Sequence, residues 1–206
     1  MTKLPYLCLV ALVSVVAVAW QTTSAKATET TLTEISQLMT FNVGYQASYK
    51  KDDDDETLTL VSQTDATETW KRSDGCTTTS LKIGFSPNLK WSGCEDKAGT
   101  QKIEIVKGKP YPLKVGNKWR YSVNGKYNSG GNWKGTGNCQ VSQSERSTTV
   151  SGEHDTLKVE CKDKWVNRTW YVSLELRQWV RFVRTHYKKG TMVWEFVKVV
   201  NEGDGS

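Results

Sequence analysis

Histidine is scarce in this chain of 206 residues, which contains only His154 and His186. The sequence also lacks the G-x-S-x-G turn of α/β-hydrolases and the H-E-x-x-H helix of zinc proteases. It has no C-x-x-C pair, which excludes a zinc ribbon and a thioredoxin-like redox site. We therefore predict no catalytic residue, no metal site and no cofactor.

A long apolar run is missing as well. The longest, Leu7 to Trp20, is shorter than the ~20 residues that a membrane-spanning helix needs. Lys3 precedes it, and residues 25–27 (AKA) follow it as an A-x-A cleavage pattern. We predict that residues 1–27 are a secretory signal peptide and that residues 28–206 form a single exported domain, periplasmic or secreted, with no transmembrane span after cleavage. An uncleaved membrane anchor is the alternative.

A strong charge of one sign is also absent. Removing residues 1–27 takes away two lysines and no acidic residue, so the net charge falls from +6 to +4. The remaining charges are well mixed along the chain, whereas nucleic-acid binders concentrate lysine and arginine on one face or tail. We expect no nucleic-acid partner.

Cysteines are few but even in number once the signal peptide is removed. Cleavage removes Cys8 and leaves Cys76, Cys94, Cys139 and Cys161. In an exported chain this count predicts two disulfides, because an oxidising compartment removes free thiols. Three pairings are possible; sequential pairing, Cys76 with Cys94 and Cys139 with Cys161, closes the shortest loops and is the one we predict.

Apolar and polar residues alternate through much of the mature chain. Residues 41–49 show this pattern, and residues 119–123 (WRYSV) repeat it before Asn124-Gly125, a turn signal. One-sided alternation is typical of antiparallel sheets. We predict an all-β domain of about 10 strands, folded as a curved antiparallel sheet, a half-barrel or a sandwich.

Two local patterns refine this prediction. Residues 178–187 and 192–200 are expected to form a hairpin joined by residues 188–190 (KKG). Residues 31–34 (TLTE) fit a helix capping box and predict one short N-terminal helix.

A W-K-x4-C spacing occurs twice, at residues 70–76 and 133–139. It suggests two disulfide-stapled sub-units, about 28–108 and 109–200, with coincidence as the alternative.

The C-terminal half carries a resemblance to a known kind of protein. Residues 112–121 (PLKVGNKWRY), 150–159 (VSGEHDTLKV) and 169–176 (TWYVSLEL) resemble the "PLxVGxxWxY", "VxxGxFxxxKV" and "TxWYSPEL" segments of uncharacterised exported bacterial β-sheet proteins. The chain departs from the pattern at His154 and lacks the proline of the third segment. Over about residues 112–200, the resemblance implies a half-barrel similar to periplasmic lipoprotein carriers, and no activity.

Two clusters of polar residues could carry chemistry. His154 lies between Glu153 and Asp155, and could form an acid–base site with these carboxylates or with Asp163. A polar turn before a strand is the alternative. Residues 52–56 (DDDDE) could hold Ca²⁺, but the glycine and glutamate of an EF-hand loop are missing, so we expect a solvated turn.

Tryptophan is the most unusual feature of the mature chain, which keeps eight of them. Their rings suit carbohydrate faces or lipid tails, but they also fill the cores of small sheets. Glycines flank Trp133, which we predict to be exposed. The predicted ligand-binding residues are Trp133, Trp170, Trp179 and Arg181; Arg184 has the opposite parity to Arg181, so the two should face opposite sides of a strand.

Three functions are compatible with these patterns. The first is a non-catalytic protein of the bacterial envelope, or a secreted one, which binds an envelope glycan, a lipid or another envelope protein through an aromatic-lined β face. The second is a periplasmic lipid or lipoprotein carrier, which requires a continuous apolar trough. The third is a hydrolase that uses His154 with nearby carboxylates, which requires a polar cleft.

Overall fold

The computed structural model describes residues 33–94 and 98–203, which belong to one compact unit. The predicted signal peptide, residues 1–27, lies outside the described residues. The described part of the chain contains no helix that is long and apolar enough to cross a membrane.

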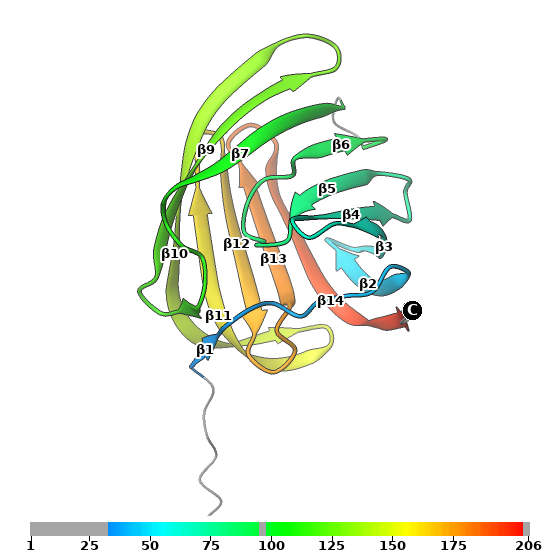
Figure 1. The fold of residues 1–206 in the computed structure, drawn as a ribbon. Helices are drawn as coiled ribbons and strands as arrows, with labels where there is room; N and C mark the ends of the chain where they lie inside the picture. The colour runs from blue at the N-terminus through cyan, green and yellow to red at the C-terminus, as the bar shows by residue number, and fades with distance from the viewer. Residues whose placement is uncertain (1–32, 95–97, 204–206) are drawn as a thin grey trace, which may run out of the picture. The chain divides into compact units, whose positions relative to one another are not determined.

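Twelve antiparallel strands close into a barrel (Figure 1). Around the barrel they are β10 (Asn132–Thr149), β11 (Gly152–Lys162), β12 (Val166–Ser173), β13 (Trp179–His186), β14 (Gly190–Glu202), β2 (Tyr45–Lys51), β3 (Asp54–Gln63), β4 (Thr67–Arg72), β5 (Thr77–Leu81), β6 (Lys90–Ser92), β7 (Gly99–Gly108) and β9 (Lys118–Tyr127). Two short strands, β1 (Glu34–Ile35) and β8 (Leu113–Lys114), form a separate two-stranded sheet.

The all-β antiparallel prediction is confirmed, but a half-barrel or a sandwich is an imprecise description of the sheet. It closes because β9 pairs with β7 on one side and with β10 on the other, while β14 pairs with β2. The sequence pattern underestimates the number of strands because β4, β5 and β6 are short and polar (TETWKR, TTTSL and KWS).

The predicted N-terminal helix is wrong. Residues 33–38 contain no helix, and Ile35 of β1 instead pairs with Leu113 of β8. Both side chains are almost completely buried in this arrangement. Burial of two apolar side chains outweighs the weak helix-start signal of the residues that precede them.

One predicted turn is wrong and one predicted hairpin is confirmed. β9 does not end at Asn124-Gly125 but continues to Tyr127, and the chain then turns through Gly130 and Gly131, both with positive φ. β13 and β14 form the expected hairpin, joined by residues 187–189.

Both predicted disulfides are confirmed with the sequential pairing, Cys76 with Cys94 and Cys139 with Cys161. The second bridge joins direct cross-strand partners on β10 and β11.

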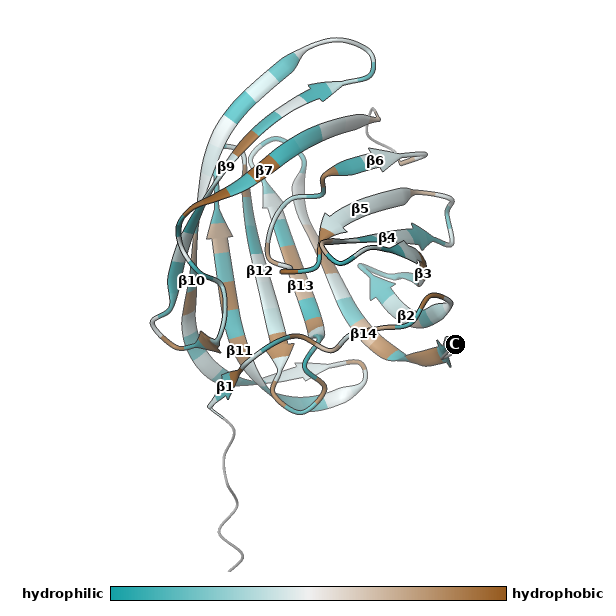
Figure 2. Ribbon diagram, in the orientation of Figure 1, coloured by the Kyte–Doolittle hydropathy of each residue, from teal (hydrophilic) through white to brown (hydrophobic). Residues whose placement is uncertain are grey.

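Buried side chains fill only part of the barrel interior. One cluster involves mainly β9–β12, and a second involves β2, β3, β13 and β14. The segment 82–89 between β5 and β6 reaches into the first cluster, where the ring of Phe85 contacts those of Trp119 and Trp170. Figure 2 shows hydrophobic bands on β11, whereas β4 and β5 are hydrophilic or neutral along most of their length. The part of the barrel interior next to β4–β6 is therefore not filled by a hydrophobic core.

Candidate functional site

The barrel contains a cavity of about 980 Å³, a size typical of small-molecule sites. Every strand of the barrel except β11 contributes at least one residue to its wall. Seven of the eight tryptophans of the mature chain line it: Trp70, Trp91, Trp133, Trp165, Trp170, Trp179 and Trp194. The eighth, Trp119, belongs to the first core cluster and is only 3% exposed.

Three of these rings lie over inward-facing glycines in the barrel wall. Trp91 covers Gly99, Trp133 covers Gly125, and Trp165 covers Gly135; the first two pairs are direct cross-strand partners. A Cβ on Gly99 or Gly125 would overlap the covering ring. Because glycine has no side chain, each ring can become part of the wall, and the lumen stays open. We call Trp91, Trp133 and Trp165 the indole row.

Hydrogen bonding and ring packing hold Trp133 in this position. Its Nε1 donates to Oε1 of Gln101 on β7 at 3.1 Å, so that the ring bridges β10, β9 and β7. The rings of Trp91 and Tyr127 pack against it, with centroids 5.8 and 4.5 Å away. Trp133 is therefore a fixed, half-buried platform rather than the exposed side chain that the flanking glycines suggest.

Charged side chains interrupt the apolar lining, and cations outnumber carboxylates. The described lining residues include Arg72, Lys82, Arg168, Arg177, Arg184 and Lys189, together with Glu68 and Asp163. Burial raises the pKa of Glu68, although a hydrogen bond from Trp70 and the charge of Lys82 act in the opposite direction. Arg72 lies over the ring of Trp194 and pairs with Glu56 and Asp74, so its charge is balanced within the wall.

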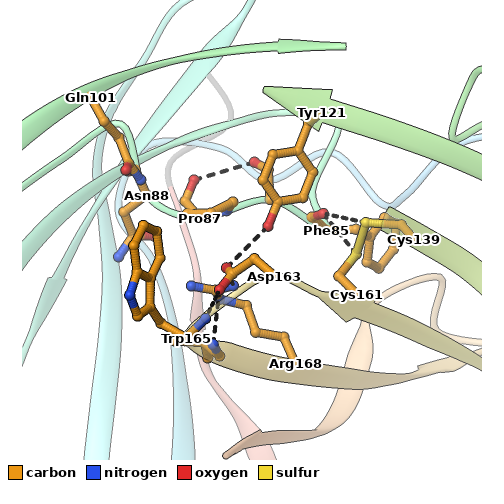
Figure 3. A network of polar contacts seen from close by, with 12 residues as sticks. Phe85, Pro87, Asn88, Gln101, Tyr121, Cys139, Cys161, Asp163, Trp165 and Arg168 are labelled. Atoms are coloured by element: carbon orange, nitrogen blue, oxygen red, sulfur yellow. Dashed lines mark hydrogen bonds and ion pairs between the residues drawn. A yellow bond between two sulfur atoms is a disulfide. The ribbon is translucent and has the colours of Figure 1, made fainter. Parts of the chain in front are cut away.

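Asp163 organises a polar network at the boundary between the cavity and the first core cluster (Figure 3). Its Oδ1 accepts hydrogen bonds from the backbone N–H groups of Trp165 and Val166, both at 2.8 Å. Its Oδ2 accepts one from Arg168 at 2.7 Å and a long one, 3.4 Å, from the hydroxyl of Tyr121. Burial would raise the pKa of Asp163, but the Arg168 guanidinium and the two N–H donors outweigh burial and lower that pKa.

Burial raises the pKa of the Tyr121 hydroxyl to about 12, against the opposing effect of Arg168. Tyr121 is thus a neutral donor, and Asp163 remains ionised. Beside this network, the carbonyl oxygen of Phe85 lies 3.8 and 3.3 Å from the sulfurs of Cys139 and Cys161. The network fixes residues 163–168 next to the second disulfide.

The structure brings three of the four predicted ligand-binding residues to the cavity: Trp133, Trp170 and Trp179. Arg181 is not among the lining residues; it pairs with Glu195 at 3.5 Å and lies over the ring of Tyr171. Arg184, three positions further along β13, lines the cavity. The parity argument therefore separates the two arginines correctly, with Arg184 on the cavity side.

His154 lies outside the cavity, on the β10–β11 hairpin. Its Nε2 is 3.0 Å from the hydroxyl of Ser151. The neighbouring carboxylates Glu153 and Asp155 both face Arg146, at 3.6 and 3.2 Å. Among residues 33–94 and 98–203, the geometry therefore brings no carboxylate to His154 in a cleft.

The acidic run spans the β2–β3 turn, residues 52–53, and the first three residues of β3. Oδ1 of Asp52 accepts a hydrogen bond from the backbone N–H of Val193, Asp55 pairs with Lys50, and the buried Glu56 accepts one from Ser73. No group of three or more potential metal ligands occurs among residues 33–94 and 98–203.

Several cavity residues were not singled out by sequence reasoning, among them Trp91, Trp165 and Gln101. One sequence pattern could have indicated this part of the cavity: Trp133, Gly135 and Gly137 occupy alternate positions, which places two glycines beside a tryptophan on one face of a strand. Glycines at alternate positions of a strand indicate close approach of another group.

An antiparallel twelve-stranded barrel with a tryptophan-lined cavity is the class of protein that the fold and the site define. No family model and no curated protein matches the chain. Among solved structures it is similar to the hypothetical lipoprotein YmcC from Escherichia coli K12, with a TM-score of 0.49 and 10% identity, over 75% of this chain and 83% of that one. It is also similar to a protein from Bacteroides fragilis described as exported and as having a YmcC-like fold, with a TM-score of 0.44 and 9% identity, over 81% of this chain and 100% of that one.

Proposed function

We propose that the mature chain is an exported, non-catalytic binding protein that holds part of an envelope glycan in the cavity of its barrel, in the periplasm or outside the cell. The observation that carries this proposal is the gathering of seven tryptophans around one cavity of about 980 Å³. The two disulfides agree with an oxidising compartment.

The mixture of side chains favours a sugar over an acyl chain. An acyl chain needs a continuous apolar surface, because it offers no hydrogen bonds to the polar groups that it would cover. Here carboxylates and cations interrupt the apolar lining on several strands, for example at Glu68, Arg72 and Arg168. A sugar ring offers an apolar face that stacks on an indole, and hydroxyl groups that bond to polar neighbours.

The indole row is preorganised for such stacking. The ring of Trp133 is held by Gln101 and by the neighbouring rings, so little side-chain freedom would be lost when a ligand binds. Three rings along the wall would offer successive platforms to a chain of sugar units.

Capture of glycans by the immobilised mature protein tests this proposal. The probe is the mixture of glycans released, without detergent, from the envelope of the organism that makes the protein, and bound material is measured by sugar analysis. We expect the wild type to retain a glycan and Trp133→Ala to lose most of it, because that substitution removes the central platform.

Tyr171→Ala is the matched control, since Tyr171 lies on β12 outside the cavity lining, and it should retain the glycan. Equal capture by the wild type and Trp133→Ala, or no capture by either, would contradict the proposal. A phospholipid that stays bound through a detergent-free purification would favour the carrier function instead.

A further inference from the structure

Two segments cross one end of the barrel and form a floor for the cavity. The first, which we call the strap, is residues 36–44 between β1 and β2. It starts beside β10, because β1 pairs with β8 and the backbone N–H of Gly116, two residues after β8, donates to the carbonyl oxygen of Val141. Further along, at β3, the side chain of Gln63 donates to the carbonyl oxygen of Phe41. β10 and β3 lie opposite each other in the closed sheet, so the strap spans the barrel (Figure 1).

The second segment connects β5 to β6 and meets the strap inside the barrel. It carries the ring of Phe85 to the wall formed by β9 and β12. The two segments are in contact, since a Cβ on Gly84 would lie 3.1 Å from Cδ1 of Leu38. The backbone N–H of Met39 also ties the strap to the carbonyl oxygen of Arg177, in the β12–β13 turn, at 2.8 Å. Leu38 and Phe85 both line the cavity, so the two segments form its floor.

The opposite end of the barrel has no such cover among the described residues. The described turns at that end join neighbouring strands with at most four residues each: 52–53, 73–76, 128–131, 163–165 and 187–189. Tyr127 and Tyr187 line the cavity there, and they are 41% and 64% exposed. The cavity therefore reaches solvent at this end and is blind at the floor.

The indole row lies near the open end. Trp91 pairs with Gly99, the first residue of β7. Trp133 is the second residue of β10, and Trp165 belongs to the β11–β12 turn. A ligand that enters from solvent therefore passes the indole row before it reaches the floor.

Polar groups lie beside an aromatic ring near the floor. Glu68 of β4 pairs with Gln63, which holds the strap, and on its other side with Ser80 of β5. Glu68 and Ser80 both line the cavity, and Oε2 of Glu68 accepts a hydrogen bond from Nε1 of Trp70 at 3.1 Å. Carboxylates and hydroxyls accept hydrogen bonds from sugar hydroxyls, while the indole offers an apolar face. This combination suits the leading sugar unit of a chain.

We propose that the cavity receives the free end of a glycan chain, with the terminal unit next to Glu68 and Ser80 and the following units along the indole row. This inference rests on the proposed function and narrows its ligand to a chain end. An internal stretch of a glycan continues in both directions and needs two exits. The described residues leave the cavity open at one end only.

The first test counts protein molecules per glycan chain. The probe is the glycan mixture released from the envelope without detergent and separated by chain length, with an excess of the mature protein added to each fraction. Light scattering combined with refractive index and absorbance gives the number bound, and methylation analysis counts the terminal sugar units. The bound number should follow the number of chain ends. A number that rises with chain length at a constant number of chain ends would overturn the proposal.

The second test fills the blind end. Ser80→Tyr places a ring in the space beside Glu68, whereas Thr79→Tyr places the same ring outside the cavity lining, on the same strand. Ser80→Tyr should lose most of the glycan capture, and Thr79→Tyr should keep it. The thermal midpoints show that both variants are folded. Capture by folded Ser80→Tyr equal to that of the wild type would overturn the proposal.

These outcomes are separable from a failure of the proposed function. Glycan capture that rises with chain length, or that survives Ser80→Tyr, retains a glycan-binding protein and rejects recognition of the chain end. No capture by the wild type rejects both.

Discussion

The two walls of the barrel differ in what their inward-facing residues contact. On β11 and β12, Leu157, Val159 and Val172 are completely buried and pack into the first core cluster. On β4, β5 and β6 no residue is buried, and Trp70, Thr78 and Trp91 face the cavity. The same strand architecture therefore supports a packed core on one side and an open lumen on the other.

The difference shows how one chain can combine stability with an unfilled interior. Side chains such as Leu157 contribute dispersion and burial energy on one wall. Next to the open wall, on β7, β9 and β10, aromatic rings lie over glycines as part of the barrel wall, and the lumen stays open. The predictions below test this contrast between the packed wall and the open wall.

The disulfides provide the largest expected effect. Their loops are similar, with sequence separations of 18 and 22 between the cysteines, so chain entropy alone predicts about 3 kcal/mol for each. Cys139 and Cys161 are both buried in the core cluster. Changing both to Ala should cost about 4 kcal/mol, and changing Cys76 and Cys94 to Ala about 3 kcal/mol. Urea unfolding measures both losses. A larger loss for the Cys76–Cys94 variant would contradict the contrast between the packed wall and the open wall.

A matched pair of leucines isolates packing from covalent effects. Leu157→Ala should lower the free energy of unfolding by about 3 kcal/mol, because it leaves a void among close-packed side chains. Leu58→Ala should cost only about 1 kcal/mol, because Leu58 borders the existing cavity. Equal losses in denaturant unfolding would show that the lumen is filled in solution.

Asp163 lies between the packed wall and the open wall, and its ionisation makes the free energy of unfolding depend on pH. The pKa of Asp163 is lower in the folded protein than the ordinary aspartate value of about 3.9, so the ionised carboxylate stabilises the fold at pH values above about 3.9. This contribution is lost as the pH falls through the lower pKa of the folded state. Asp163→Asn should cost about 2 kcal/mol at neutral pH, since Arg168 loses its partner, and almost nothing in acid.

Urea unfolding at several pH values measures this loss. Asp155→Asn is the control: its pair with Arg146 is exposed, and the expected loss is within about 0.5 kcal/mol. A loss for Asp163→Asn that stayed constant down to low pH would argue against the ion pair as its cause.

The smallest expected difference in the free energy of unfolding is between substitutions at two glycines that aromatic rings cover. Tyr121, completely buried, covers Gly137, whereas Trp133 covers Gly125 beside the lumen. Gly137→Ala should cost about 2 kcal/mol because the tyrosine has no space to move into. Gly125→Ala should cost about 1 kcal/mol and shift the tryptophan emission, because Trp133 can swing into the cavity. Unchanged emission would show that the ring does not move.

Alternating apolar residues predicted the packed wall well. Of residues 119–123, the apolar Trp119, Tyr121 and Val123 are buried as expected, and both disulfide pairings followed from the order of the cysteines. These features depend on local pattern and short loops, which a single sequence shows directly.

The open wall could not be predicted in the same way. Inward-facing Thr78 and Ser80 give no apolar alternation because the lumen next to them is unfilled. Barrel closure between β7 and β9, and the approach of Trp165 to Gly135, depend on long-range pairing. Trp133 was assigned to ligand binding from its glycine neighbours, but its position over Gly125 required the register of β9 and β10.

Native mass spectrometry of the mature protein, purified without detergent from the envelope of its own host, tests the central claim most directly. The claim is that the tryptophan-lined cavity holds an envelope glycan. The predicted result is a protein with two disulfides that carries an additional mass, released as an oligosaccharide. A protein that carries only a phospholipid, or that carries no ligand even after incubation with the envelope glycans, would contradict it.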